Sequence, residues 1–208
     1  MSKCNSTIKK ESNQHKRTAY GVGYSSGGKY KSKIGGVRSK SYEAWRSMLR
    51  RCYSDKSLKR QPSYIGCTVD ERWHDFQVFA KWYESQIFYD LGYHLDKDLL
   101  SGDSKMYSEH SCALIPASIN TLINEQKPST GEYPKGVGLH KRMGRLHANI
   151  RMNGKKHHLG YFDCPQEAHQ AYVVAKEAYV KEVANEWRGR IDERVYEALM
   201  RWTVKDNM

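Results

Sequence analysis

An alternating run of residues in the C-terminal part of the chain constrains its fold most. Residues 145–151 read Arg-Leu-His-Ala-Asn-Ile-Arg, and polar and apolar side chains alternate along them without exception. Because successive side chains of a β-strand point to opposite faces of the sheet, this pattern predicts a strand with one buried and one exposed face. The core-facing residues would be Leu146, Ala148 and Ile150, and the outward-facing ones Arg145, His147, Asn149 and Arg151.

The residues on either side of this strand predict its partners. A turn at Met143-Gly144 precedes the strand, and Asn153-Gly154 follows it. Asn-Gly is the dipeptide most typical of a two-residue hairpin turn. The flanking segments 136–141 and 155–162 are then the neighbouring strands, so we expect a three-stranded antiparallel sheet.

The segment after the third strand predicts a helix that covers this sheet. Pro165 suits a first helical turn, and Glu167 would lie near the positive end of the helix dipole. Small and aromatic residues then recur at the spacing of one helical face. They are Ala168, Ala171, Tyr172, Ala175 and Tyr179. Because alanine is small, such a helix can lie close to the sheet.

Positive charge on this segment points to a polyanionic partner. Seven Lys or Arg residues and no acidic residue lie between Glu132 and Asp163, and the chain carries a formal net charge of +12. A solvated basic face without a partner is the alternative, but unopposed cations on an alternating strand favour nucleic acid. An anionic membrane surface is the weaker choice. No run of eighteen apolar residues and no signal-peptide core is present, so a membrane or secretory fate is not expected.

The cysteines indicate the compartment and argue against a zinc site. There are five, an odd number, and none has the close paired spacing of zinc ligands. Reduced, mostly buried thiols are therefore expected, which predicts a cytoplasmic protein.

Several spaced motifs of the C-terminal segment resemble the plant ethylene-response-factor (APETALA-two) DNA-binding domain. They are KGV, the GR-x-x-A-x-I-R core, LGYF and the helix PQEAHQAY. The resemblance implies that the outer face of the sheet enters the major groove of double-stranded DNA, whose width admits a small β-ribbon. The DNA-binding residues would be Arg142, Arg145, His147, Asn149, Arg151, Lys156 and His158. RNA is a weaker alternative, because strand 145–151 exposes no aromatic stacking pattern.

The rest of the chain divides into three parts. Residues 1–18 predict a disordered basic tail, residues 19–124 a domain of mixed α/β character, and residues 125–132 a polar linker to the domain at 133–208. Three apolar stripes predict buried helix faces rather than binding platforms. They are Tyr42, Trp45, Met48, Leu49 and Cys52; Trp73, Phe76, Phe79, Ala80 and Tyr83; and Trp187, Ile191, Val195, Leu199 and Trp202. The last stripe favours packing within the chain over dimerisation, so a monomer is expected.

Candidate chemistry lies at residues 93–100. Alternation places His94, Asp96 and Asp98 on one strand face. Two carboxylates at this spacing can bind Mg²⁺, and a nearby histidine can act as a base, as phosphodiester hydrolysis requires. A second strand at 112–115 and a helix opening at 116–120 would complete a ββα-metal element. In the alternative interpretation, the two carboxylates form salt bridges and Asn120 caps a helix.

This segment, with the upstream motifs W-x-x-M-x-x-R-C and R-W-x-x-F-x-x-F, resembles the HNH-type homing endonucleases of phages. The resemblance implies catalytic roles for His94, Asp96, Asp98 and Asn120, with Mg²⁺ on Asp96 and Asp98, no organic cofactor, and the host cytoplasm as the location. Lys97 and Ser111 stand where the family motif has a histidine and an asparagine.

Two functions therefore follow from the sequence. One is a metal-dependent DNA endonuclease, and the other is a non-catalytic DNA-binding or regulatory protein derived from such an enzyme. The predicted elements together indicate an α+β fold, with an N-terminal mixed α/β domain that contains the possible ββα-metal element and a C-terminal three-stranded antiparallel sheet packed on a helix.

Overall fold

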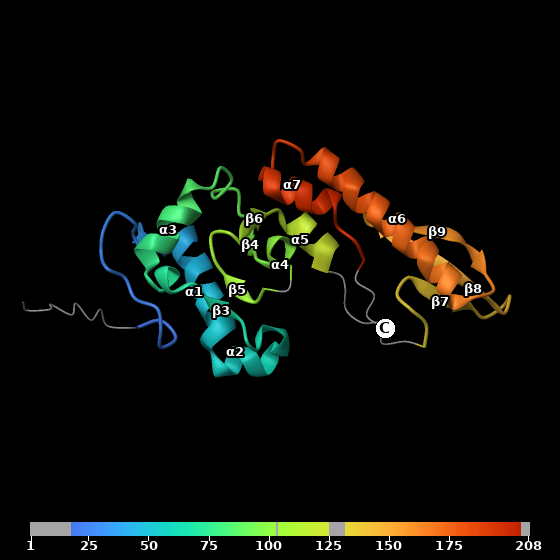
Figure 1. The fold of residues 1–208 in the computed structure, drawn as a ribbon, viewed down its shortest axis with the longest axis horizontal. Coiled ribbons are helices and arrows are strands. Elements are labelled where there is room, and N and C mark those ends of the chain that lie inside the picture. Colours follow the sequence, from blue (N-terminus) through green and yellow to red (C-terminus); the bar gives the residue numbers. More distant parts are fainter. Residues whose placement is uncertain (1–17, 103, 125–131, 205–208) are drawn as a thin grey trace, which may run out of the picture. The chain divides into compact units, whose positions relative to one another are not determined.

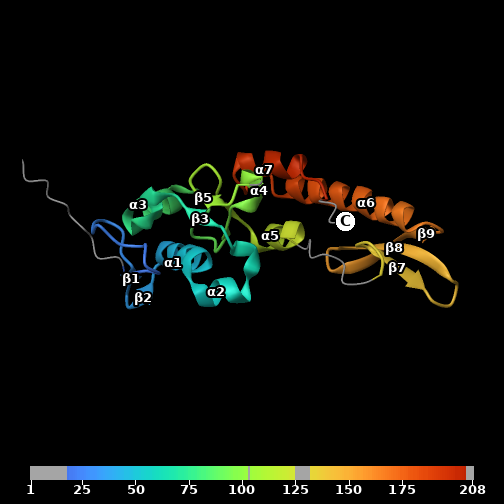
Figure 2. The same ribbon diagram turned by 60° about the horizontal axis from the view of Figure 1, so that its bottom comes forward.

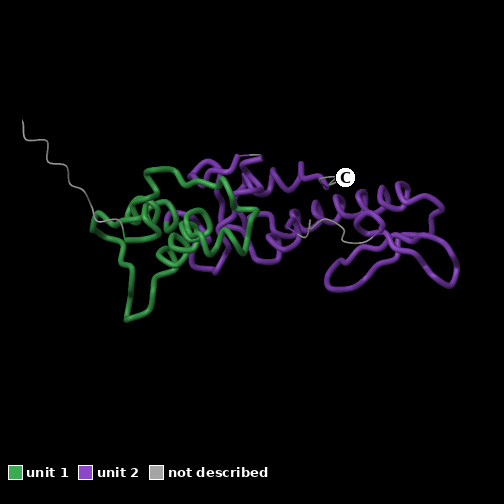
Figure 3. The backbone as a smooth tube through the Cα atoms, turned by 90° about the horizontal axis from the view of Figure 1, so that it is seen from below, with its two compact units in different colours: residues 1–84 green, residues 85–208 purple. Residues whose placement is uncertain are grey.

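The computed structural model describes residues 18–102, 104–124 and 132–204. The chain forms two compact units, residues 1–84 (unit 1) and 85–208 (unit 2), shown in different colours in Figure 3. Nearly all of the predicted tail 1–18 and of the predicted linker 125–132 lies outside the described residues. The domain borders inferred from the sequence stay predictions.

Unit 1 is mainly helical. Its helices are α1 (Lys40–Tyr53), α2 (Asp55–Arg60) and α3 (Phe76–Ser85), its 3-10 turns are η1 (Pro62–Tyr64) and η2 (Glu71–His74), and its short strands are β1 (Lys33–Ile34), β2 (Val37–Arg38) and β3 (Thr68–Val69). Helix α1 begins after Ser39, whose side chain accepts a hydrogen bond from the Tyr42 amide. Such an N-cap satisfies a backbone donor that the first turn leaves open.

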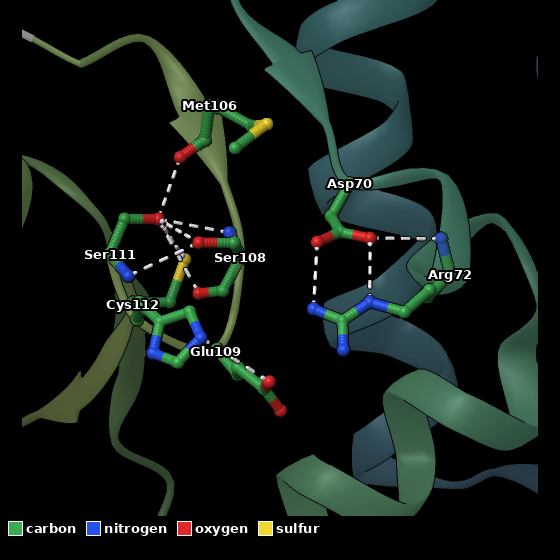
Figure 4. Close-up of polar contacts among 8 residues, drawn as sticks. Asp70, Arg72, Met106, Ser108, Glu109, Ser111 and Cys112 are labelled. Carbon is green, nitrogen blue, oxygen red and sulfur yellow. Dashed lines mark hydrogen bonds and ion pairs between the residues drawn. The ribbon is translucent and has the colours of Figure 1, made fainter.

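Both apolar stripes predicted for this unit form its core. Trp45, Met48 and Leu49 of α1 are buried, as are Phe76 and Phe79 of α3. The second stripe differs in one respect, because Trp73 lies in η2 and not in the helix itself. Asp70 caps η2 by accepting hydrogen bonds from the Arg72 amide and guanidinium (Figure 4). The Trp45 indole then donates to the Trp73 carbonyl at 2.8 Å, which joins the turn to α1.

Unit 2 contains the strands β4 (His94–Asp96), β5 (Met106–Tyr107), β6 (Ala113–Ile115), β7 (Val137–His140), β8 (Arg145–Met152) and β9 (Lys155–Phe162) and the helices α4 (Asp98–Ser101), α5 (Ala117–Asn124), α6 (Pro165–Glu186) and α7 (Glu193–Met200). Strand β4 pairs antiparallel with β6, and α5 follows β6 directly. The strand, strand, helix order predicted for this region is confirmed.

The C-terminal sheet has the predicted architecture. Its strands follow the order β7-β8-β9, both pairs are antiparallel, and α6 covers one face of the sheet (Figures 1 and 2). Leu146, Ala148 and Ile150 of β8 are buried beneath this helix, together with Ala168 and Tyr172 of α6. The α+β class and the sheet-on-helix arrangement are therefore confirmed.

Helix α6 is longer than the sheet requires, and its second half builds another core. Val180, Val183 and Ala184 are buried in a cluster with residues of β6, α5, α7 and the turn before α7. The partners are Ala113, Ile115, Ile119, Ile123, Ile191, Val195 and Leu199. The predicted stripe thus packs inside unit 2, but it does not form one helix: Val195 and Leu199 lie in α7, Trp187 ends α6, and Ile191 and Trp202 lie on either side of α7. The ββα region and the sheet share one helix.

A glycine at the start of β7 permits the close contact between the sheet and α6. Gly136 has φ +82°, and a Cβ at this position would overlap Tyr172 of α6. We expect Gly136→Ala to lower the free energy of unfolding by about 2–5 kcal/mol, because left-handed backbone strain and overpacking add together. Urea unfolding would measure the change. The matched control is Gly144→Ala, with φ +63° and no atom near the added Cβ, for which we expect about 1 kcal/mol. Equal losses in the two variants would contradict the packing argument.

Candidate functional site

The outer face of the C-terminal sheet collects the predicted polar and basic side chains. Residues directly opposite each other in antiparallel strands have side chains on the same face. On β9, Tyr161 lies opposite His147, His158 opposite Asn149, and Lys156 opposite Arg151. The structure therefore brings together six of the seven residues predicted to bind DNA. They are Arg145, His147, Asn149, Arg151, Lys156 and His158. Arg142 lies apart from them, in the exposed turn between β7 and β8.

A β-bulge in β9 determines which side chains reach this face. Ala148 pairs with Gly160 and Asn149 pairs with His158, so Leu159 is an extra residue without a partner on β8. An extra residue reverses the alternation beyond it. His158 and Tyr161, three positions apart, consequently lie on the same face. Sequence reasoning missed Tyr161, although a glycine inside a strand pattern, here Gly160, is the signal that indicates a bulge.

Three histidines and Tyr161 form an aromatic cluster in the middle of the face. The ring centroids of His158 and Tyr161 are 4.6 Å apart, and those of His140 and Tyr161 are 5.7 Å apart. His147 lies 6.2 Å from both of the other histidines. Gly138 makes room for it, because a Cβ there would lie 3.1 Å from His147 Nε2. Sequence reasoning had not included His140, which β7 contributes.

The cluster offers hydrogen-bonding atoms that the described part of the chain leaves unused. Among the described residues, the buried Nδ1 atoms of His140 and His147 have no hydrogen-bond partner. Buried polar atoms are normally satisfied, and exceptions need a reason. Burial, followed by the nearby Lys156 and the other two histidines, lowers the pKa of His147 below its ordinary value. Near neutral pH this imidazole is therefore an uncharged ring among cations.

The cations of the face differ in how far they are already neutralised. Arg145 Nε lies 3.1 Å from Asp163 Oδ1, so this guanidinium has an intramolecular partner. Arg151 and Lys156 are exposed, and no carboxylate among the described residues pairs with either of them. Two adjacent uncompensated cations produce a positive potential that a polyanion would lower.

The second candidate site lies where β4 faces α5. His94 is the first residue of β4, and its Nδ1 is 3.2 Å from Asn120 Nδ2 on α5. The side-chain amide of Asn124 in turn donates a hydrogen bond to Asn120 Oδ1. The structure thus brings two of the four predicted catalytic residues together at an exposed position, where the amides orient the imidazole ring.

The two predicted carboxylates lie in different surroundings. Asp96 is buried, and its Oδ2 accepts a hydrogen bond from the Leu99 amide at 2.9 Å. Burial raises the pKa of its carboxyl group. Asp98 is exposed and pairs with the ammonium of Lys97, which also lies 5.7 Å from the ring centroid of Tyr107.

The predicted placement of Asp98 on the strand with His94 and Asp96 is wrong. The strand ends at Asp96 and Asp98 opens α4, because the Asp96 side chain binds a backbone amide three residues later and so favours a helical turn. No group of three His, Cys, Asp or Glu side chains that could hold a metal occurs among the described residues. The binding of Mg²⁺ by Asp96 and Asp98 stays a prediction.

Ser111, which stands at the motif position of an asparagine, closes a turn. Its hydroxyl donates to the Met106 carbonyl at 2.6 Å and accepts a hydrogen bond from the Ser108 amide at 2.9 Å (Figure 4). Ser111 lies in the connection 108–112 between β5 and β6, and its hydroxyl bonds hold this connection against β5, which indicates a structural role.

Nothing matches this chain in comparisons with protein-family models, with curated proteins or with solved structures. No helix in the described ranges combines the length and the apolar character that crossing a membrane requires. The functional interpretation therefore rests on the geometry of the two candidate sites.

The environment of His147 predicts a measurable titration. We expect its NMR titration midpoint to lie below about 6.5, the ordinary value for histidine. As the pH falls below this value, the unfolded chain binds the proton more readily than the folded chain. Protonation of His147 therefore lowers the free energy of unfolding at acidic pH, and above about 6.5 it contributes no pH dependence. Lys156→Gln should raise the midpoint, because it removes a neighbouring cation. The matched control is Lys155→Gln, whose side chain projects from the opposite face of β9. A midpoint at or above 6.5 in the wild type would refute the prediction.

Proposed function

We propose that the protein binds double-stranded DNA through the outer face of β7, β8 and β9. The supporting observation is that six basic or polar side chains predicted to contact DNA lie on one face of the sheet, while α6 covers the other face. The segment that builds the sheet, residues 133–162, contains no acidic residue. A face of this kind attracts a polyanion, and Arg145 is its one cation that pairs with a described carboxylate, Asp163.

The residues of this face divide naturally into two roles. Arg151 and Lys156 are opposite neighbours, and no carboxylate of the described ranges pairs with them, which suits them to phosphate oxygens. Asn149 and the histidine cluster lie nearer the middle of the sheet and offer donors and acceptors to base edges. The major groove of B-form DNA admits a small sheet, whereas that of duplex RNA is too narrow for side chains to read. Double-stranded DNA is therefore the favoured partner.

A pair of neighbouring lysines tests this proposal. Lys156 lies opposite Arg151 on the outer face, whereas Lys155 lies opposite Met152 on the other face. Lys156→Gln should weaken binding to duplex DNA and reduce the slope of log K against log salt by about 0.9, the value for one lost phosphate contact. Lys155→Gln removes the same charge and should leave the slope nearly unchanged. Fluorescence anisotropy over a salt series would measure both. Identical slopes for the two variants and the wild type would overturn the assignment of this face.

A second candidate function is hydrolysis of phosphodiester bonds in the bound DNA. The observation in its favour is the oriented pair of His94 and Asn120, located on a β-strand and on the helix that follows the paired strand. An exposed imidazole can accept a proton from an attacking water molecule. Asp98 is ion-paired and Asp96 is buried, so the support for hydrolysis comes from His94 and Asn120 alone.

Plasmid nicking separates the enzyme from the pure DNA binder. If the protein hydrolyses DNA, wild type with Mg²⁺ should relax supercoiled plasmid, and His94→Gln should lower the rate by about 10²-fold or more, as expected for a lost general base. His110→Gln is the matched control, because His110 is an exposed histidine of the same unit that lacks the contact with Asn120. DNA binding without nicking by the wild type would assign the protein to the non-catalytic class. Equal nicking by His94→Gln would remove His94 from the mechanism.

A further inference from the structure

The charge excess of the chain lies almost entirely in unit 1. Residues 1–84 contain 18 Lys or Arg and 7 Asp or Glu, which gives a net charge of +11. Residues 85–208 contain 17 Lys or Arg and 16 Asp or Glu, which gives a net charge of +1. The unit with the proposed DNA-binding sheet is therefore close to neutral as a whole. Unit 1 therefore carries an excess of positive charge that the proposed role of the sheet does not explain.

A basic pocket of about 620 Å³ lies in unit 1 where α1 meets α2. Its lining consists of three cations, two hydroxyls and one amide. The residues are Arg50, Ser54, Lys56, Ser57, Arg60 and Gln61. No carboxylate from the described part of the chain lines this pocket, and each of these six side chains can donate a hydrogen bond.

The local sequence explains why these side chains converge. Ser54 ends α1, with its amide donating to the Arg50 carbonyl, and it also precedes the first residue of α2. The two helices therefore meet at one residue. Lys56 and Arg60 are four positions apart and lie on the same side of α2. Arg50, in the last turn of α1, lines the same pocket.

The three cations have no acidic partner in the described part of unit 1. No carboxylate there lies within ion-pair distance of Arg50, Lys56 or Arg60, and Arg50 makes only a 3.4 Å contact with the Ser47 hydroxyl. Other arginines of the unit are compensated, for example Arg38 by Glu43 and Arg72 by Asp70. Three like charges around one pocket repel each other, and a bound anion would offset this repulsion.

Helix capping explains only part of this arrangement. Arg50 and Arg60 lie in the last turns of their helices, where a cation is favoured by the helix dipole. Lys56 lies in the first turn of α2, where a cation is disfavoured. A role in stabilising the helices therefore does not account for Lys56, whereas an anion held in the pocket does.

We propose that this pocket binds a phosphate group. Arginine donates paired hydrogen bonds that match two phosphate oxygens, and lysine and serine supply single donors at adjustable positions. The phosphate could belong to the DNA backbone or to a small phosphate compound, which present the same chemistry to these residues. The inference goes beyond the DNA-binding proposal, because the pocket belongs to the other unit and uses no residue of the sheet.

Inorganic pyrophosphate is the first probe, added to the full chain and followed by amide NMR shifts. We expect saturable shifts in residues 50–61 of the wild type and at least a tenfold weaker dissociation constant in the double variant Lys56→Gln/Arg60→Gln. Lys59→Gln is the matched control, since Lys59 is an exposed cation of the same helix that does not line the pocket. Spectra of the variants without ligand confirm that unit 1 remains folded.

Duplex DNA is the second probe, and it distinguishes the two sources of phosphate. A nucleic-acid phosphate in the pocket predicts that the double variant reduces the salt slope of DNA binding by about 0.9 or more, and that Lys59→Gln does not. Pyrophosphate binding with an unchanged DNA slope assigns the pocket to a small phosphate compound. The proposal is overturned if pyrophosphate causes no shifts and the DNA slope is unaffected. Failure of the sheet proposal would instead appear in the Lys156→Gln variant, which leaves the pocket intact.

Discussion

Unit 2 depends on the burial of one long helix. The first half of α6 covers the inner face of the sheet through Ala168 and Tyr172, and its second half contributes Val180, Val183 and Ala184 to a core with α5 and α7. Gly136 permits the close approach of the sheet at one end of this contact. Because α6 occupies the inner face, the polar side chains of the sheet lie on the other face, where Arg151 and Lys156 are exposed. The proposed DNA-binding surface is thus a consequence of the packing of this helix.

The two units divide the electrostatics of the protein between them. Unit 2 presents a local basic face on an almost neutral body, whereas unit 1 carries nearly the whole net charge and a hollow lined by cations. The basic face of the sheet suits the recognition of individual bases, because base edges in the major groove present donors and acceptors to side chains that enter it. A large net charge acts at longer range and depends steeply on salt. We infer that the two units contribute differently to any nucleic-acid complex.

The region around β4 shows how local chemistry can override a sequence pattern. Alternation predicted one strand face for His94, Asp96 and Asp98, but the Asp96 side chain accepts a hydrogen bond from the Leu99 amide and the chain turns into α4. Burial of Asp96 and the ion pair of Asp98 with Lys97 then give the two carboxylates different surroundings. The contact between His94 and Asn120, 26 residues apart, arises from the pairing of β4 with β6.

The sequence alone determined the α+β class, the three strands, the inward and outward residues of the central strand, and the helix that covers the sheet. These features follow from periodicity and turn residues, which act over a few positions. Tertiary structure decided the rest. The bulge at Leu159 brought Tyr161 onto the outer face, and strand pairing brought His140 beside His147. The junction of α1 and α2 gathered Arg50, Lys56 and Arg60 around one pocket. The first two depend on pairing between strands, and the third on the angle at which two consecutive helices meet, neither of which periodicity specifies.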